Sequence, residues 1–148
     1  MHRKHDIDAI AAALMELTGL LNSPGRDEVL MAEAGVALPR ALFPLLVRIG
    51  AAGAAAVTAL ADQAGRDHST ISRQVAQLEA LGFVRRRIRP RDARVNEVAI
   101  TAAGRQAVAR VTAARRRLLG PLLSDWSPAE RRELARLNLK LAAAIRTA

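Results

Sequence analysis

The chain has 148 residues, no cysteine and a formal net charge of +9. The lack of cysteine excludes disulfides, thiol redox sensors and thiolate metal sites, and the positive charge predicts a polyanionic partner, with nucleic acid first and an anionic membrane surface second. Acidic residues interrupt the segment after the basic start, which excludes a signal peptide, and the longest uncharged run, Ile49 to Ala61, is shorter than the roughly 20 residues of a membrane-spanning helix. We therefore expect one cytoplasmic domain.

Two helices are predicted in the first 35 residues. Apolar residues recur at helical spacing over residues 7–21, which indicates an amphipathic helix. The sequence Asn-Ser-Pro-Gly that follows is a helix breaker. Ser23 within it is a typical N-cap residue, so we expect a second helix from there to Gly35, which is a typical C-cap residue.

The next segment predicts a third helix over residues 38–49, interrupted by a proline. Pro44 should kink or split this helix, because proline lacks the N–H that the helical ladder needs. Residues 50–56 are all glycine or alanine, which indicates a small-residue connection. Thr58 is then expected to cap a short helix over residues 59–64.

Residues 65–81 predict a helix-turn-helix. Gly65 ends the short helix and Asp67 caps the next one, so two helices meet across a turn of about three residues that contains a glycine. Apolar residues of the second helix, from Ile71 to Leu81, fall on one face. The opposite face has hydrogen-bonding side chains and almost no acid, as suits a helix that enters the DNA major groove. The candidate DNA contacts on it are Ser69, Thr70, Ser72, Arg73, Gln74 and Gln77.

An arginine-rich hairpin is predicted after Gly82, with strands over residues 83–89 and 94–100 joined by a turn at residues 90–93. Such a density of positive charge is unfavourable unless something neutralises it, and a phosphate backbone would do so. The alternative is a solvated hairpin whose charge serves solubility. The arginines, which are opposed by Asp92 alone, are Arg85, Arg86, Arg87, Arg89, Arg91 and Arg94.

Two more helices complete the chain. Thr101 is expected to cap a long helix over residues 102–119, and Ser127 begins the last helix with a complete capping box that ends at Glu130. Apolar residues line one face of this last helix, which is either a dimer interface or ordinary core. We favour a dimer interface, because few partners remain for this face within a small chain. The residues of the face are Leu134, Leu137, Leu141 and Ile145.

The order of these elements resembles the MarR family of winged helix-turn-helix transcriptional regulators, closely over about residues 37–104. The resemblance implies a mainly α-helical fold with a small β-hairpin wing. It also implies that residues 1–148 form a single domain, in which helices at about residues 6–34 and 102–147 dimerise. The stretches that carry it are Leu60–Ala61, Ser69–Arg73, Leu78–Arg86, Arg91–Arg94 and Ile100–Arg105.

The resemblance implies a homodimer that offers two recognition helices and two wings to a pseudo-palindromic DNA site. Ile10 and Leu14 would join the last helix in the dimer interface. Members of the family typically repress transcription, and many release DNA when a small, often aromatic and anionic molecule binds between the two lobes. No cofactor, metal or membrane is expected.

Different roles are expected for the candidate DNA contacts. Arg73 could read guanine through a bidentate contact, and Gln74 could read adenine in the same way. Hydroxyl groups near the helix start suit phosphates. The alternatives are that Ser69 and Thr70 only cap the helix and that Arg73 pairs with Glu79.

The wing residues have roles that come from the resemblance. Arg91 and Arg94, like Arg89, would contact the minor groove or the DNA backbone, and Asp92 would position Arg94. Near the third helix, Arg40 and Arg48 could pair with a carboxylate of a ligand, although structural salt bridges are the expected outcome there.

The sequence argues against an enzyme. It has no phosphate-binding glycine loop, no HExxH or GxSxG motif, and only three histidines. The remaining alternative is an architectural protein that coats DNA without sequence preference. The ordered polar face of the recognition helix argues against it, because coating needs only charge.

Overall fold

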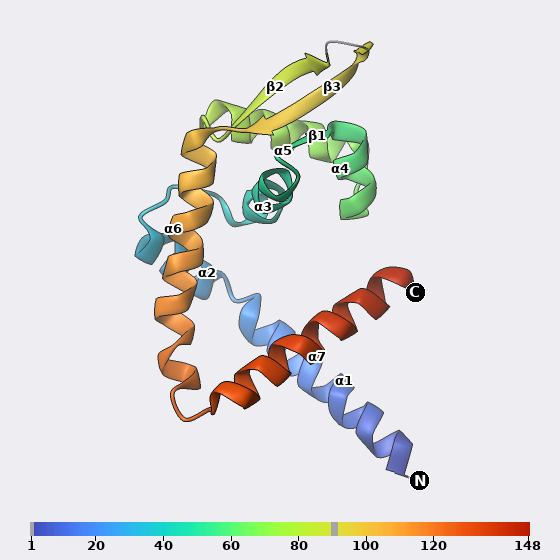
Figure 1. Ribbon diagram of the computed structural model, residues 1–148, viewed down its shortest axis with the longest axis vertical. Helices are drawn as coiled ribbons and strands as arrows, with labels where there is room; N and C mark the ends of the chain where they lie inside the picture. Colours follow the sequence, from blue (N-terminus) through green and yellow to red (C-terminus); the bar gives the residue numbers. More distant parts are fainter. Residues whose placement is uncertain (1, 90–91) are drawn as a thin grey trace. The chain divides into compact units, whose positions relative to one another are not determined.

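The computed structural model of the chain describes residues 2–89 and 92–148, and the side chains of His2, Arg89 and residues 92–96 lie outside that description. The fold is mainly helical with a small antiparallel sheet, which confirms the predicted fold class of helices with a hairpin wing. The elements in chain order are α1 (His2–Leu21), α2 (Pro24–Ala34), the 3₁₀ helix η1 (Arg40–Leu42), α3 (Phe43–Ala52), β1 (Ala54–Ala56), α4 (Val57–Ala64), α5 (His68–Ala80), β2 (Val84–Arg89), β3 (Asp92–Ile100), α6 (Ala102–Leu119), the 3₁₀ helix η2 (Pro121–Leu123) and α7 (Pro128–Thr147) (Figure 1).

The chain divides into two compact units, residues 1–114 and residues 115–148, with the boundary inside α6. All buried apolar side chains of the described chain lie between Ala34 and Ala114, and we call this stretch the core lobe. Its centre is formed by side chains of α3, α4, α5, the sheet and α6. The side chains with no exposed surface include Leu46, Ile49, Val75, Leu78, Val98 and Val111.

The terminal helices contrast with the core lobe. In the second unit, neither η2 nor α7 has a buried residue. In α1, large apolar side chains are also exposed, with Ile10 at 51% and Leu14 at 37%. No helix in the part of the chain that the structure describes is long and apolar enough to cross a membrane.

Local signals placed some helix ends correctly and others wrongly. Pro44 splits the predicted third helix into η1 and α3, and it lies in the first turn of α3, where its missing N–H costs no helical bond. Ser23 stands at the N-cap of α2, but its side chain makes no capping hydrogen bond. The helix α4 begins at Val57, so the expectation that Thr58 caps it is wrong. Ser127 and Glu130 form the predicted capping box of α7.

Residues 54–56 form a strand that the sequence did not predict. Strand β1 pairs antiparallel with β3, with Ala54 opposite Ala99 and Ala56 opposite Glu97. A run of glycine and alanine has no β-branched or aromatic signal for a strand. The strand exists because the backbone edge of β3 accepts it, and it gives a sheet of order β1-β3-β2.

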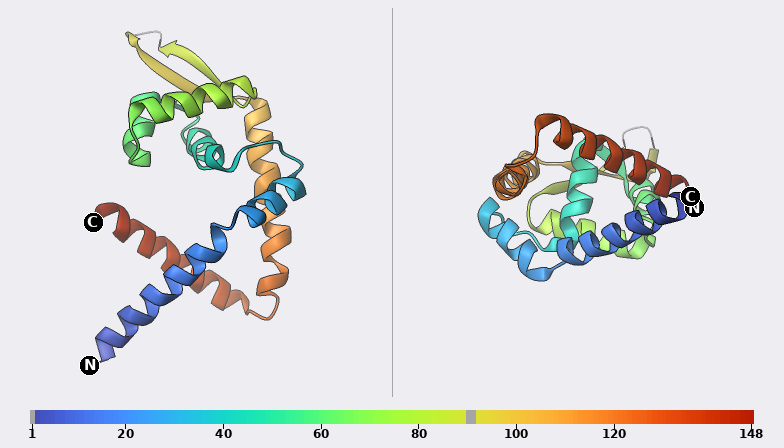
Figure 2. Two further views of the ribbon diagram at one scale, coloured as in Figure 1. Left: turned by 180° about the vertical axis from the view of Figure 1, so that it is seen from behind. Right: turned by 90° about the horizontal axis from the view of Figure 1, so that it is seen from below.

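The two strands of the hairpin extend beyond α5 as a wing (Figures 1 and 2). They are paired from Val84 opposite Ile100 to Ile88 opposite Asn96, with a register shift after Ile88. Strand β3 begins at Asp92, two residues before the predicted start.

The base of the hairpin is tied to the start of α6. The hydroxyl of Thr101 donates a hydrogen bond to the carbonyl of Gly82 at 2.6 Å and accepts one from the backbone N–H of Gly104 at 3.1 Å, so the predicted cap is present. A Cβ on Gly104 would collide with the carbonyl oxygen of Phe83 and with Ile100. Glycine at position 104 therefore allows the close contact between α6 and the hairpin.

Candidate nucleic-acid interface

Helices α4 and α5 meet across a short turn, as the sequence predicts. Gly65 ends α4 in the left-handed conformation, with φ of 61°. Asp67 caps α5, because its carboxylate accepts hydrogen bonds from the backbone N–H of Thr70 at 2.6 Å and from the Thr70 hydroxyl at 3.0 Å. These two bonds, together with the nearby charge of Arg73, hold the pKa of Asp67 below its ordinary value. The first turn of α5 is therefore held by hydrogen bonds to the residue that precedes it.

The polar side chains of α5 do not all face solvent equally. Ser69, Arg73 and Gln77 are exposed and lie one turn apart, so they form a continuous stripe along the helix. Thr70 and Gln74 are half-buried on one flank of this stripe. On the inner side, Ile71, Val75 and Leu78 are buried as predicted, but Leu81 is 43% exposed because the helix has ended before it.

Arg73 belongs to the exposed stripe and is not held by an acid. Within the described residues, its guanidinium donates a long hydrogen bond of 3.5 Å from Nη2 to the Thr70 hydroxyl. Glu79 instead accepts a hydrogen bond at 2.8 Å from the backbone N–H of Arg86. The alternative that Arg73 pairs with Glu79 is therefore wrong.

Arg86 connects the hairpin to α5. Its Nη2 donates to the backbone carbonyl of Ser72 at 2.8 Å and to the Ser72 hydroxyl at 3.4 Å. Together with the bond from its N–H to Glu79, this fixes β2 against the recognition helix at two points. The sequence counted Arg86 only as part of the positive charge of the wing, and nothing in its spacing indicated a partner 14 residues away.

Arg87 is also engaged within the protein. It lies opposite Glu97 in the strand register, and its Nε is 2.9 Å from a carboxylate oxygen of Glu97, whose side chain is 11% exposed. The free positive charge of the wing is therefore smaller than the arginine count suggests. Arg85 is exposed, and within the described residues it has no ion pair.

The tip of the wing lies outside what can be placed. Arg91 is not among the described residues, and the side chains of Arg89, Asp92 and Arg94 are outside the description. The roles predicted for these four residues stay predictions.

Two arginines near the third helix have different surroundings. The Nε of Arg40 is 2.8 Å from a carboxylate oxygen of Asp27, and its guanidinium also donates to the carbonyl and side-chain oxygens of Asn22. This is the structural salt bridge that we expected, and it connects η1 to the junction of α1 and α2. Arg48 lines a pocket instead.

The first unit holds two pockets worth noting. The pocket that Arg48 lines has a volume of about 190 Å³ and lies between α3 and α5. The other has a volume of about 240 Å³ and includes one cation. It is lined by Gly35, Val36, Ala37, Leu81, Phe83, Ala107 and Arg110.

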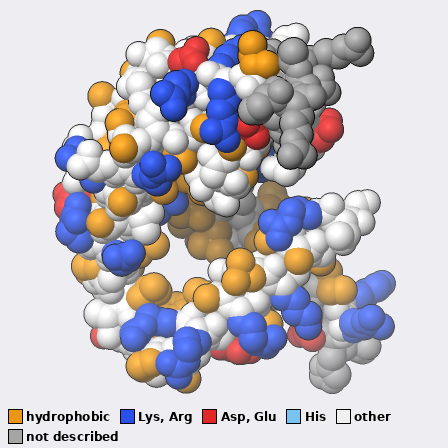
Figure 3. Space-filling model, turned by 45° about the horizontal axis from the view of Figure 1, so that its top comes forward, with side chains coloured by type: hydrophobic (Ala, Val, Ile, Leu, Met, Phe, Trp, Pro, Cys, Tyr) orange, Lys and Arg blue, Asp and Glu red, His pale blue; other side chains and the backbone are white. Residues whose placement is uncertain are grey.

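The remaining described surface offers charge and apolar area. Lys and Arg side chains outnumber acids on the face drawn in Figure 3. Over residues 2–89 and 92–148, no three His, Cys, Asp or Glu side chains gather as metal ligands would. The predicted dimer residues are exposed apart from Leu141, which is half-buried. The exposed ones are Ile10, Leu14, Leu134, Leu137 and Ile145.

Comparisons with known proteins agree with this architecture. Residues 38–95 match the model of the MarR family, whereas no curated protein matched the chain. The solved RV1404 protein of Mycobacterium tuberculosis is 26% identical, with a TM-score of 0.73 over 93% of this chain and 92% of that one. A MarR family protein of Bacillus stearothermophilus has a TM-score of 0.80 at 21% identity, over 97% of each chain. A mutant MarR of E. coli, solved in complex with operator DNA, has a TM-score of 0.65 at 22% identity, over 87% of this chain and 93% of that one.

Proposed function

We propose that the chain, whose residues 38–95 match the MarR family model, is a sequence-specific double-stranded DNA-binding transcriptional regulator. One observation carries the proposal. The exposed stripe of Ser69, Arg73 and Gln77 lies on a helix that Arg86 ties to an arginine-rich wing. A helix of this size with such a face fits the major groove, and the adjacent wing can follow the phosphate backbone.

The residues of this surface have different roles in DNA binding. Arg73 reads a base, with Gln77 and Gln74 beside it, and Ser69 binds a phosphate. Thr70 and Ser72 contribute less through their hydroxyls, because Asp67 and Arg86 already engage them. The cationic wing residues bind the backbone or the minor groove, and Asp92 positions Arg94. The wing residues with this role are Arg85, Arg89, Arg91 and Arg94.

The protein acts as a homodimer on a pseudo-palindromic operator. The support is the exposed apolar face of α7, with Leu137 at 46% and Ile145 at 63%, together with the exposed apolar residues of α1. Two recognition helices would lie roughly 34 Å apart to enter successive major grooves. The dimer represses transcription and is released by a small anionic or aromatic ligand. The E. coli complex with operator DNA supports operator binding by analogy of fold, and repression and release by a ligand are what the family resemblance implies.

Selection of bound fragments from a random DNA pool tests the proposal. A pseudo-palindromic sequence should be enriched. With on the order of 6–10 phosphate contacts, its affinity should fall about 10³–10⁵-fold between 50 and 200 mM salt. Equal affinity for selected and random DNA would instead identify an architectural DNA-coating protein. No binding to duplex DNA at low salt would refute both.

The different roles of Arg73 and Arg91 predict different effects of their substitution. Arg73→Ala should weaken binding to the selected operator by about 1–3 kcal/mol and relax preference at one base pair, because it removes a base contact. Arg91→Ala should weaken selected and random DNA to a similar degree, because it removes a phosphate contact. Fluorescence anisotropy with both duplexes measures the difference. If Arg73→Ala and Arg91→Ala lower the ratio of affinity for selected DNA to affinity for random DNA by the same factor, the assignment of Arg73 is wrong.

A further inference from the structure

The helix α1, a candidate for the dimer interface, joins the core lobe without burying a side chain of its own. Every residue of α1 from Arg3 to Leu21 is exposed, so packing within the chain does little to fix its direction. The chain leaves α1 through Asn22 and Ser23, and the Ser23 side chain makes no capping hydrogen bond. The junction between α1 and α2 therefore has neither an apolar core nor the usual N-terminal cap.

Arg40 of η1 reaches this junction with three contacts, which we call the Arg40 clamp. Its Nη1 donates to the backbone carbonyl of Asn22 at 3.1 Å, and its Nη2 donates to the side-chain oxygen of Asn22 at 2.8 Å. Its Nε lies 2.8 Å from Oδ2 of Asp27, in the first turn of α2. One planar guanidinium thus binds the residue that follows α1 and an acid of α2 at the same time, so it holds the two helices at one angle.

Asp27 depends on the Arg40 clamp. Its Oδ2 atom is buried, and no described group donates a hydrogen bond to it, so the charge of Arg40 is what balances it. A buried carboxylate oxygen that loses such a partner is strongly unfavourable, and it moves to water where the backbone allows this. Loss of Arg40 should therefore release the N-terminal end of α2, while its C-terminal end stays packed in the core through Ala34.

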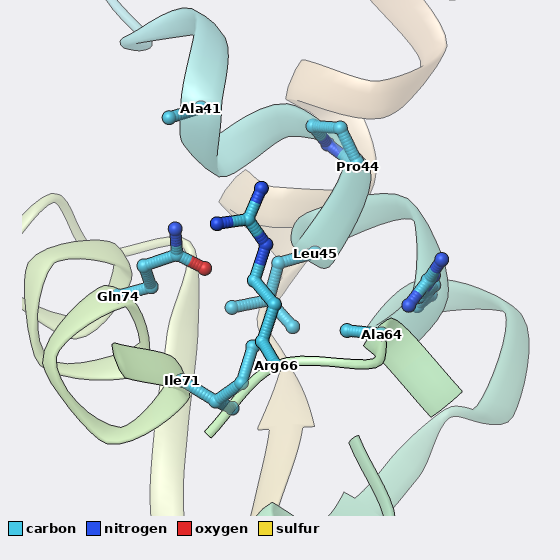
Figure 4. A pocket seen from close by; sticks show the side chains of 8 residues that line it. Ala41, Pro44, Leu45, Ala64, Arg66, Ile71 and Gln74 are labelled. Carbon is cyan, nitrogen blue, oxygen red and sulfur yellow. The ribbon is translucent and has the colours of Figure 1, made fainter. Parts of the chain in front are cut away.

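The segment that carries Arg40 lies beside the recognition helix. Ala41, the next residue of η1, lines the pocket between α3 and α5 together with Gln74 of α5 (Figure 4). Leu42, the last residue of η1, is 2% exposed and belongs to the core. Arg40 is thus attached to a tightly packed part of the lobe, one residue away from a pocket wall that α5 shares.

We propose that Arg40 is a positioning residue, which fixes the direction of α1 relative to the lobe and so sets the separation of the two recognition helices in the dimer. The inference rests on the proposed function, because this separation matters only when two lobes bind one operator. A dimer whose lobes cannot tilt about the junction accepts one half-site spacing. Without the Arg40 clamp the lobes sample several separations, and the apparent affinity falls by the fraction that fits the operator.

The first experiment measures the clamp in the full chain without DNA. Because the chain has no cysteine, nitroxide labels attach only at two introduced sites, Ala12→Cys on α1 and Gln63→Cys on α4. Both positions are exposed, and Ala12 lies on the face of α1 away from Ile10 and Leu14. The labelled chain exchanges into excess unlabelled chain of the same variant, so double electron–electron resonance reports one distance within a protomer. A narrow distribution is expected, and Arg40→Ala should broaden it.

Arg26→Ala is the matched control, because Arg26 is an exposed arginine of α2 that makes no ion pair with a described residue. It should leave the distribution narrow. Arg40→Lys keeps a charge near Asp27 but loses the fork to Asn22, so it should give an intermediate width. Equal widths in the wild type and Arg40→Ala, or equal broadening in Arg26→Ala, would refute the clamp. If Arg40→Ala fails to fold, Arg40→Lys and Asn22→Ala carry the test, and unchanged widths in both would refute it.

The second experiment compares operators by fluorescence anisotropy. The selected duplex gains or loses one base pair between its half-sites, which moves them by about 3.4 Å and turns one against the other by roughly a tenth of a turn. The wild type should lose a large part of the roughly 10²–10⁴-fold gain from binding both half-sites at once. Arg40→Ala should bind the selected duplex about tenfold more weakly, which corresponds to one tenth of the population holding the fitting separation.

The ratio between duplexes distinguishes positioning from a loss of stability. Arg40→Ala should lose less affinity than the wild type when the half-sites are respaced, because its lobes adapt to more than one spacing. A variant that is merely less stable weakens all three duplexes by one factor and keeps the wild-type ratio. That result would refute the positioning role of Arg40.

The two experiments also separate this inference from the proposed function. If Arg40→Ala broadens the distance distribution but the wild type binds no duplex, the proposed function and the role of Arg40 in spacing are both wrong, and only the clamp of α1 stands. If the wild type binds its operator and Arg40→Ala leaves the distribution unchanged, the inference alone is wrong.

Discussion

The core lobe and the terminal helices place their apolar side chains in opposite ways. In the lobe, Leu78 and Val75 have no exposed surface, whereas Leu139 of α7 is 69% exposed. The helix α7 nevertheless has a complete capping box at its start. Local signals are therefore sufficient to define a helix, but only packing gives it a buried face. The lobe contains its own partners, whereas in the proposed homodimer the terminal helices obtain theirs from a second copy.

Removing α7 should have the largest effect. Deletion of residues 131–148 should give a monomer with a folded core lobe, because no residue of α7 is buried and none belongs to the core. Binding to the operator should fall by about 10²–10⁴-fold, the usual gain from linking two sites. Sedimentation equilibrium and circular dichroism check the two parts of this expectation.

A point variant separates the interface from the helix itself. Leu137→Glu should also give a monomer, because it places a charge in the apolar face. Lys140→Glu makes a change of charge on the same helix outside that face and should remain a dimer. A dimer in Leu137→Glu, or in the truncated chain, would show that α7 does not form the interface.

The next largest effect should be on the core of the lobe. Leu78→Ala should lower the free energy of unfolding by about 2–5 kcal/mol, because it leaves a cavity among side chains that cannot fully collapse. Leu139→Ala on α7 should change it by no more than about 0.5 kcal/mol, since Leu139 lies 69% exposed and off the apolar stripe. Urea unfolding at one protein concentration compares them, and equal losses would erase the distinction between the two regions.

Two glycine substitutions, one in the core lobe and one in α1, should differ in their effect on stability by a smaller amount. Gly104→Ala should cost about 1–3 kcal/mol, because the added methyl group meets the backbone of Phe83. Gly19→Ala, in the last turn of α1 with no atom within 4 Å of the added carbon, should be neutral or stabilising by up to about 1 kcal/mol. Thermal unfolding of the two variants measures the contrast. A neutral Gly104→Ala would mean that α6 can move away from the hairpin.

The smallest effect should be the pH dependence of two exposed carboxylates. Asp67 has a pKa below its ordinary value of 3.8 chiefly because it accepts the backbone N–H of Thr70, and Glu133 has a lowered pKa because of Arg136. Both therefore stabilise the folded chain above their unfolded pKa, and both contributions disappear as the pH falls through the folded pKa.

Salt and amide variants separate the two carboxylates. About 1 M NaCl should screen the ion pair of Glu133 and leave most of the hydrogen-bonded cap of Asp67. Melting of the wild type, Asp67→Asn and Glu133→Gln at several pH values tests this. The difference between wild type and each variant should vanish at the acidic end. If high salt removed the stabilisation by the Asp67 cap as completely as that by the Glu133 ion pair, the expectation would be contradicted.

The sequence predicted what depends on neighbouring residues. The cap by Asp67, the turn at Gly65 and the buried face of α5 are set within a few positions of one another, and the structure confirms them. The strand at residues 54–56 could not be predicted, because only the edge of β3 makes it a strand. The cap at Thr58 failed because α4 begins one residue earlier, at Val57, whereas Ser23 stands at the predicted N-cap of α2 but its side chain makes no capping hydrogen bond.

On the proposed DNA-binding surface, too, features set by neighbouring residues were predicted and long-range contacts were not. The exposed stripe of α5 follows from helical periodicity, so Arg73 was identified correctly as exposed. The contacts of Arg86 with Ser72 and of Arg87 with Glu97 join residues 14 and 10 positions apart, and composition shows these arginines only as charge. Long-range pairing therefore decided which cations remain free for a partner.

The contact between Arg86 and the recognition helix constrains any attempt to retarget the protein. A transplanted helix carrying another specificity would retain its orientation only if Glu79 stays in place and the carbonyl at position 72 remains within reach of Arg86. We therefore expect a change of specificity to succeed when it replaces only the exposed residues Ser69, Arg73 and Gln77. Such a change keeps the contacts of Arg86 with Glu79 and with the carbonyl at position 72.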